Sequence, residues 1–114
     1  GMTEADLAGH LARGETVILD LQAWAEDDPT PDDYSDNWED GHYVVLVGMD
    51  DAYLYVMDPS LSAGYGYIAR SELKARWRDY EDRGGVVWRN AGLGIVSRGR
   101  ARPPGFPAPL QRVR

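Results

Sequence analysis

The stretch that decides the fold is GHYVVLVGMDDAYLYVMDP, residues 41–59. Two apolar runs, rich in β-branched and aromatic residues, flank Asp50-Asp51, a pair that is typical of turns. This pattern predicts a β-hairpin. Both strands carry apolar or aromatic side chains on both of their faces, so we expect the hairpin to lie in the middle of a sheet and to be covered on both sides.

The length of the turn decides whether His42 and Asp58 meet. With an odd number of turn residues centred on Asp50, His42 lies directly opposite Asp58, on one face with Val44, Leu46, Leu54 and Val56. With a two-residue turn, Asp50-Asp51, the His42 and Asp58 side chains fall on opposite faces.

A carboxylate that faces an imidazole fixes its tautomer and raises its basicity, as in the base and orienting residue of a nucleophilic triad. The alternative interpretation is structural: His42 bonds a backbone carbonyl at the start of a strand, and Asp58-Pro59 begins a turn.

The rest of the chain predicts an α+β fold, an antiparallel β-sheet of about five strands flanked by two short helices. Thr3 and Asp6 nearly match a capping box and begin a helix over residues 4–13, and Ser71 begins a second helix over 71–80. The predicted strands are 16–24, 43–49, 53–58, 65–69 and 86–97, with a split of the last into two as the alternative. The expected core consists of Leu7, Leu11, Val17, Leu19, Leu21, Val44, Leu46, Leu54, Val56, Ile68, Leu73, Trp77 and Ile95.

Residues 25–40 hold eight carboxylates, and we expect a long acidic loop there. The order of residues 36–41 places Trp38 where an EF-hand needs an oxygen ligand, so the EF-hand pattern fails. A looser cation site and a solvated loop both remain open.

With 114 residues the chain has room for one domain, which we place at residues 1–97. Residues 98–114 hold five Arg and four Pro and are expected to form an extended or disordered tail. The absence of Cys excludes disulfides, thiolate metal sites and a cysteine nucleophile, and two His residues argue against a histidine zinc site. We therefore expect no metal and no cofactor.

Charge is divided unevenly along the chain. Residues 1–58 carry fifteen acidic residues and one basic residue, whereas residues 59–114 carry four acidic and eleven basic residues. The two halves should attract each other, and the net charge of -7 argues against nucleic acid as a partner. No run of about 18 apolar residues exists to span a membrane, and nothing resembles a signal peptide, so a cytoplasmic location is expected.

Residues 41–48 (GHYVVLVG), Asp50-Asp51 and residues 56–60 (VMDPS) resemble the His and Asp segment of the bacteriocin-processing family of papain-like cysteine peptidases. That family trims double-glycine leader peptides. The elements flanking the segment follow in the same order, and the resemblance covers roughly residues 4–97. It implies the sheet half of a papain-like fold, with His42 as the general base and Asp58 as the residue that orients it.

The chain departs from this family at the nucleophile. The family uses a Cys on an N-terminal helix and a Gln shortly before it for the oxyanion hole. This sequence has no Cys, and Gln22 falls on a strand after that segment. The serines at 35, 60, 62, 71 and 97 also lie outside the place of the nucleophile helix. We therefore expect no peptide cleavage.

Three functions remain open: a non-catalytic papain-like relative that binds a peptide or protein, the C-terminal half of a cysteine peptidase for double-glycine leader peptides whose Cys lies on a segment outside this sequence, or an unrelated small α+β binding domain. In a papain-like fold the nucleophile helix packs along the sheet. We therefore expect the face of His42, Val44 and Leu46 to be bare beside Trp24 and Trp38, and a homodimer to bury at least about 1,000 Å² there. The Arg-rich tail could cross to the acidic loop of the second copy.

Overall fold

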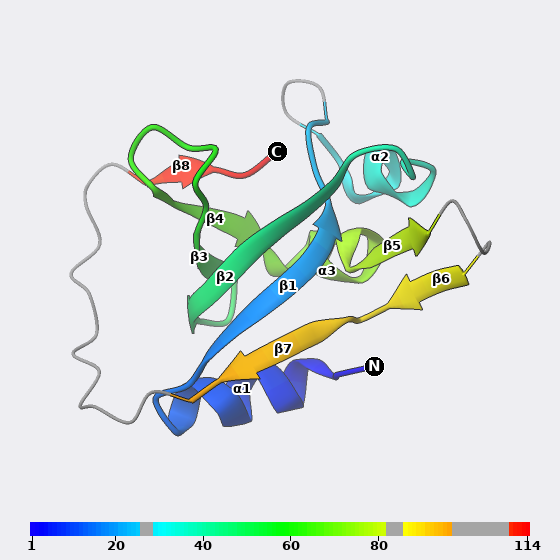
Figure 1. Cartoon of the computed structure of the whole chain (residues 1–114). Helices are drawn as coiled ribbons and strands as arrows, with labels where there is room; N and C mark the ends of the chain where they lie inside the picture. The colour runs from blue at the N-terminus through cyan, green and yellow to red at the C-terminus, as the bar shows by residue number, and fades with distance from the viewer. Residues whose placement is uncertain (26–28, 82–85, 97–109) are drawn as a thin grey trace.

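The computed structural model describes residues 1–25, 29–81, 86–96 and 110–114 (Figure 1). The described chain is an α+β fold, as predicted. Its helices are α1 (Glu4–Ala12), α2 (Pro31–Ser35) and α3 (Arg70–Arg76). Its strands are β1 (Thr16–Gln22), β2 (Gly41–Met49), β3 (Tyr53–Met57), β4 (Tyr65–Ala69), β5 (Arg78–Glu81), β6 (Val86–Arg89), β7 (Gly92–Ile95) and β8 (Gln111–Arg112).

Six strands form the main sheet in the order β7-β1-β2-β3-β4-β8, and β5 and β6 form a separate two-stranded sheet. The pairs from β7 to β4 are antiparallel, but β8 runs parallel to β4. The main sheet is therefore mixed, where the sequence predicted an antiparallel sheet of about five strands. The hairpin of β2 and β3 lies in the middle of the sheet, as expected.

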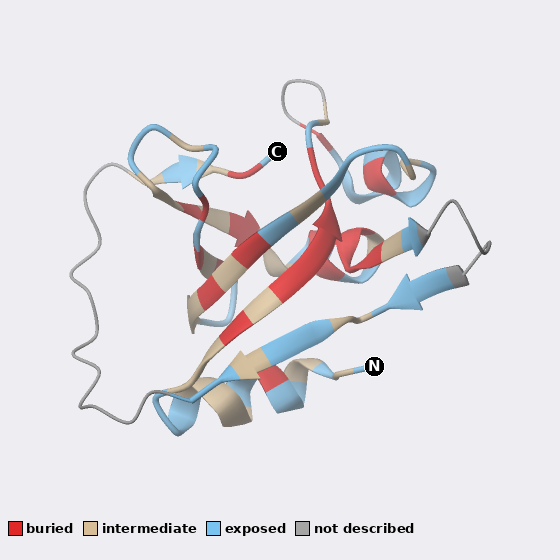
Figure 2. Cartoon of the chain, in the orientation of Figure 1, coloured by how far each residue is buried: buried red, intermediate tan, exposed pale blue. Residues whose placement is uncertain are grey.

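The two faces of the main sheet differ. One face packs against α1 and α3, and Figure 1 shows both helices on the far side of the sheet. We call this the covered face, and the core side chains lie between it and the two helices. Figure 2 marks the buried residues along β1, β2, β4 and α3 in red. The buried hydrophobic residues of the core are Leu7, Val17, Leu19, Leu21, Ala23, Val44, Leu46, Leu54, Val56, Ile68, Leu73, Trp77 and Val113.

The opposite face carries no helix among the described residues, and we call it the open face. Its exposed large side chains are Tyr43, Tyr53, Met57, Leu93 and Ile95. The expectation that the hairpin is covered on both sides is therefore wrong. The expectation that the face of His42, Val44 and Leu46 is bare is also wrong. Val44 and Leu46 are 1% and 0% exposed, and the opposite face is the bare one.

A β-bulge sets the register of the central hairpin. Met49 pairs with Leu54 and Gly48 with Tyr55, which fits a two-residue turn at Asp51-Ala52. Leu46 then pairs with Val56, so Val47 is an extra residue on β2. With the even turn alone, His42 and Asp58 would lie on opposite faces of the sheet, and the bulge returns them to the same face. Neither of the two predicted registers is present, but the two side chains share a face, as the odd-turn register predicted.

Part of the expected acidic loop is helical. Thr30 caps α2 by donating its backbone N–H to the Asp33 carboxylate at 2.7 Å, and Pro31 occupies the first turn. Tyr34 of this helix is fully buried, and the Arg76 guanidinium stacks over its ring at 4.2 Å. The sequence signals for a capped helix were present, but the burial of Tyr34 depends on a partner 42 positions away.

The helix predicted over residues 71–80 is α3 in the structure, and it is shorter than predicted. It ends at Arg76, and the chain continues as β5 rather than helix to residue 80. Arg78 then donates to the backbone carbonyls of Tyr34 and Ser35 and stacks over Trp38 at 3.7 Å. These contacts hold α2 against the start of β5.

The end of the predicted tail belongs to the fold. Residues 98–109 lie outside the described residues, but β8 joins the sheet and Val113 enters the core. Arg112 donates to the Pro29 carbonyl oxygen at 3.0 Å, so this tail residue reaches the acidic segment of its own chain. Ile95, predicted in the core, is 42% exposed because it lies on the open face of β7.

Arg76 is the polar centre of the covered side. It is fully buried, and it donates to the Gln22 carbonyl at 2.9 Å, the Val113 carbonyl at 2.8 Å and the Glu72 carboxylate at 3.1 Å. These bonds join β1, α3 and the C-terminal segment. Burial lowers the pKa of Arg76, an effect that the neighbouring Tyr34 and Glu72 oppose.

Replacing Arg76 by Ala should lower the free energy of unfolding by about 3–5 kcal/mol. Among the described residues, the buried Glu72 carboxylate would keep only Arg112 as a partner, and the Gln22 and Val113 carbonyls would lose their donor. Urea unfolding followed by circular dichroism measures the loss. The control is Lys74→Ala on the exposed side of the same helix, which should stay within about 0.5 kcal/mol of the unmodified chain. Equal effects of the two changes would contradict this role of Arg76.

Candidate functional site

His42 and Asp58 come together at the end of the central hairpin. The His42 Nε2 atom lies 2.9 Å from Asp58 Oδ2. His42 pairs with Leu21 on the covered face, and Asp58 directly follows β3, two positions beyond the buried Val56. The predicted neighbours are therefore present, although through a bulged register rather than direct cross-strand pairing.

The two oxygens of the Asp58 carboxylate have different contacts. Oδ1 accepts from the Ser60 backbone N–H at 2.9 Å and from the Ser60 hydroxyl at 2.6 Å. Oδ2 contacts His42 at ion-pair distance but without the alignment of a hydrogen bond. The Asp58 side chain is fully buried and the His42 side chain is 15% exposed, so solvent screens this pair weakly.

Trp24 packs against the His42 ring at one side of the site. Its ring centroid lies 4.8 Å from that of His42, with the planes tilted by 52°. Trp24 has a φ of 64°, in the left-handed region that non-glycine residues rarely adopt, and its N–H donates to the Arg114 carbonyl oxygen at 2.5 Å. The C-terminal residue thus holds Trp24 in place over His42.

This arrangement can hold a proton, but no nucleophile faces it among the described residues. With Nε2 directed at Asp58, Nδ1 is the ring atom left for a reacting group. Ser60 is close in space, but its hydroxyl donates to the orienting carboxylate instead of to His42. Gln22 donates to the Arg78 carbonyl at 3.2 Å and to Asp79 at 3.0 Å, which occupies its amide in a structural role.

A pocket of about 680 Å³ adjoins the pair, lined by Trp24, Ala25, Ser60, Leu61, Gln111, Arg112 and Arg114. Its lining includes Trp24 and Ser60, which contact His42 and Asp58, but neither His42 nor Asp58 itself. That Arg112 and Arg114 line this pocket was not predicted from the sequence, because residues 98–114 were expected to form a tail. The one available signal was the apolar Val113 between them.

Among the described residues, no three His, Asp or Glu side chains gather into a group that could hold a metal ion. Residues 26–28 of the acidic segment, which the sequence left open as a cation site, lie outside the described residues. None of the described helices has the length and apolar character needed to cross a membrane.

Comparison with known proteins supplies no family for this chain: no family model matches it, and no curated protein or solved structure matches it. The resemblance to papain-like peptidases therefore stays a prediction that rests on the residues of the central hairpin.

The geometry predicts the tautomer of His42, which should carry its proton on Nε2, the atom that faces Asp58. His10 serves as the control, because its Nδ1 contacts the Glu15 carboxylate and the Arg13 guanidinium, both far from Asp58 in the sequence. Long-range ¹H–¹⁵N correlation spectra at pH 8 distinguish the two forms. In Asp58→Ala, His42 should lose this preference while His10 keeps its own. An Nδ1-protonated His42 in the unmodified chain would contradict the described pair.

Proposed function

We propose that this chain is a binding and assembly module: a non-catalytic relative of the papain-like peptidases that pairs with a second copy of itself through the open face. The observation that carries the proposal is the composition of that face. Leu93 and Tyr43 are each 62% exposed on adjoining parts of the sheet, with no described helix over them. A bare apolar sheet face is uncommon on a monomer and favours a partner.

Tyrosine dominates the open face. Five of the seven tyrosines of the chain, Tyr43, Tyr53, Tyr55, Tyr65 and Tyr67, share it through the register of β2, β3 and β4. Tyr53 packs edge-on against Tyr67 at 5.2 Å. Tyr is enriched in protein interfaces because it offers a large apolar ring with a hydroxyl for hydrogen bonding. A second copy presents the same surface, which is the requirement for a symmetric pair.

The His42–Asp58 pair supports the non-catalytic part of the proposal. Asp58 is fully buried, the Trp24 ring packs against His42 at a tilt, and the Ser60 hydroxyl donates to Asp58. The pair therefore stabilises the end of the hairpin whether or not it takes part in chemistry. The sequence contains no Cys to react through it.

The second candidate is the His/Asp half of a cysteine peptidase. One observation favours it: the carboxylate faces Nε2, so Nδ1 is left for a thiol from another segment or chain, as in the base and orienting residue of a triad. By the resemblance, the substrate would be a double-glycine leader peptide.

For the proposed pairing, we expect a dimer by light scattering at micromolar concentration, burying at least about 1,000 Å² in total. Met57→Glu, which places a charge on the open face, should shift the mass to that of a monomer. Ala8→Glu places the same charge on the exposed side of α1 and should leave the dimer intact. A monomeric unmodified chain at 100 µM would reject the homodimer.

For the absence of catalysis, we expect hydrolysis of a double-glycine leader peptide and of an activated ester to stay at the background rate. Activity that disappears in His42→Ala would contradict the non-catalytic proposal. Co-expression with a Cys-bearing polypeptide encoded nearby is the test of the second candidate, which requires cleavage that depends on both that Cys and His42.

A further inference from the structure

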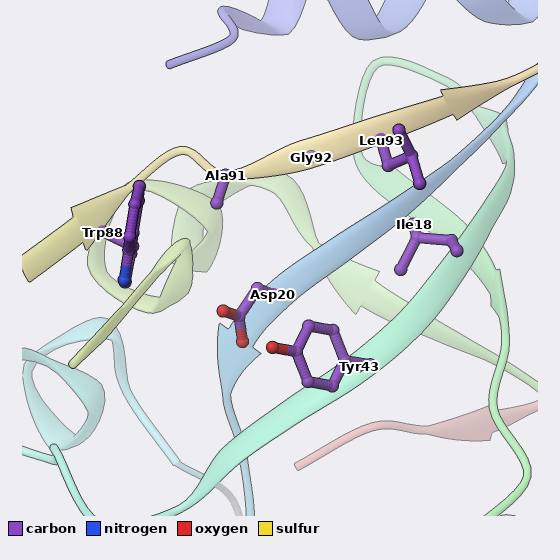
Figure 3. A pocket seen from close by; sticks show the side chains of 7 residues that line it. All are labelled: Ile18, Asp20, Tyr43, Trp88, Ala91, Gly92 and Leu93. Carbon is purple, nitrogen blue, oxygen red and sulfur yellow. The ribbon is translucent and has the colours of Figure 1, made fainter. Parts of the chain in front are cut away.

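A pocket on the open face is built from apolar walls and one buried carboxylate. It has a volume of about 680 Å³ and lies where β1, β2 and β7 meet the segment between β6 and β7 (Figure 3). Figure 3 shows Asp20 and the Tyr43 hydroxyl pointing toward one another, with Ile18, Leu93 and Trp88 around them. The remaining lining residues are Ala91 and Gly92.

Asp20 is an unusual residue for this position. It is 9% exposed, in the middle of β1 between the fully buried Leu19 and Leu21. Its Oδ1 atom is buried and has no hydrogen-bond partner. An unpartnered buried carboxylate oxygen costs folding free energy, so its presence in a pocket indicates a ligand group that supplies the missing partner.

A second carboxylate adds to the negative potential. Asp79 of β5 packs so closely against Gly41 that a Cβ built there would lie 2.6 Å from Asp79 Oδ2. Burial, and then the negative charge of Asp79, raise the pKa of Asp20 to about 6. The titratable groups that face Asp20 are Asp79 and Tyr43, and the pocket-lining part of β7, Gly92 and Leu93, carries none.

We propose that this pocket binds an organic cation, an ammonium or guanidinium group carried on an apolar body or stem. The cation would take the free Oδ1 of Asp20. The apolar part would lie between Leu93 and Ile18, with Trp88 and Tyr43 offering ring faces to the charge.

The chemistry of the lining excludes the other simple ligands. An anion would meet the Asp20 carboxylate and no lining Lys or Arg, and the negative charge of Asp79 acts on the same site. Calcium needs six to eight oxygen ligands and magnesium an octahedral set, whereas most of this lining is aliphatic or aromatic. A neutral apolar molecule would leave Oδ1 of Asp20 without a partner.

The experiment titrates benzylammonium into ¹⁵N-labelled Met57→Glu, in which the open face is accessible whether or not the unmodified chain pairs. We expect saturable shifts of Leu93, Ala91 and the Trp88 indole, with a dissociation constant on the order of 1 mM. Benzyl alcohol, the uncharged analogue, should give none. Adding Asp20→Asn should weaken benzylammonium binding at least tenfold, and adding Asp51→Asn, an exposed turn residue, should not. Binding that is unchanged by Asp20→Asn, or no binding, would overturn the proposal.

The pH dependence provides a second test. Benzylammonium stays charged below pH 8, so affinity should follow the ionisation of Asp20 and fall roughly tenfold from pH 7 to pH 5. The free chain should respond too. Because the pKa of Asp20 is higher in the folded chain than its ordinary value, protonation favours folding, and stability should fall as pH rises from 4 through 6. Asp20→Asn should remove this fall, which also shows that the variant folds.

The source of the cation is distinguished by light scattering. If benzylammonium dissociates a dimer of the unmodified chain, and Asp20→Asn weakens that dimer, a basic side chain of the second copy fills the pocket. If the dimer is unaffected, the natural ligand is a free amine or guanidine. Benzylammonium binding by a chain that is always monomeric would reject the proposed pairing and leave the pocket proposal standing.

Discussion

The register of the central hairpin decides which side chains of β2 point to the covered face, and nearly everything else in this fold depends on it. With the two-residue turn at residues 51 and 52 alone, the side chains in the first half of β2 would point to the wrong face, and the extra residue Val47 corrects this. As a result, Leu46, Val44 and His42 all point to the covered face. The same correction brings His42 to Asp58, so the core and the candidate site depend on a single bulge.

The sequence predicted the positions of the four central strands, because alternating apolar residues and turn pairs are local signals. It also predicted that His42 and Asp58 meet, although their register depended on the bulge at Val47. The neighbouring Gly48, an isolated glycine in a strand, was the local signal for that bulge. The elements it missed are held by distant contacts. Tyr34 is buried under Arg76, and Val113 enters the core beside β4, so the local residues do not indicate how α2 and β8 pack. For α2, Thr30 and Pro31 did signal where the helix begins.

The exposure of the open face was missed for a related reason. Strand residues that are apolar on both sides are typical of a sheet buried between two layers, and the chain supplies one described layer only. Asp20 did give a signal in the sequence, as a carboxylate within the apolar run 17–21. That Asp20 lines a pocket could be seen only in the structure, which places Tyr43 beside it and leaves its Oδ1 atom without a hydrogen-bond partner.

In the proposed function the two faces have different roles: the covered face holds His42 and Asp58 in a closed, structural setting, and the open face meets partners. Backbone ¹H–¹⁵N spectra of the unmodified chain and of Met57→Glu, recorded at the same concentration, test this division most directly. We predict differences between the two spectra at Tyr43, Leu93 and Ile95, with Trp24, His42 and Ser60 unchanged. Shifts confined to the residues around His42, with none on the open face, would contradict the account.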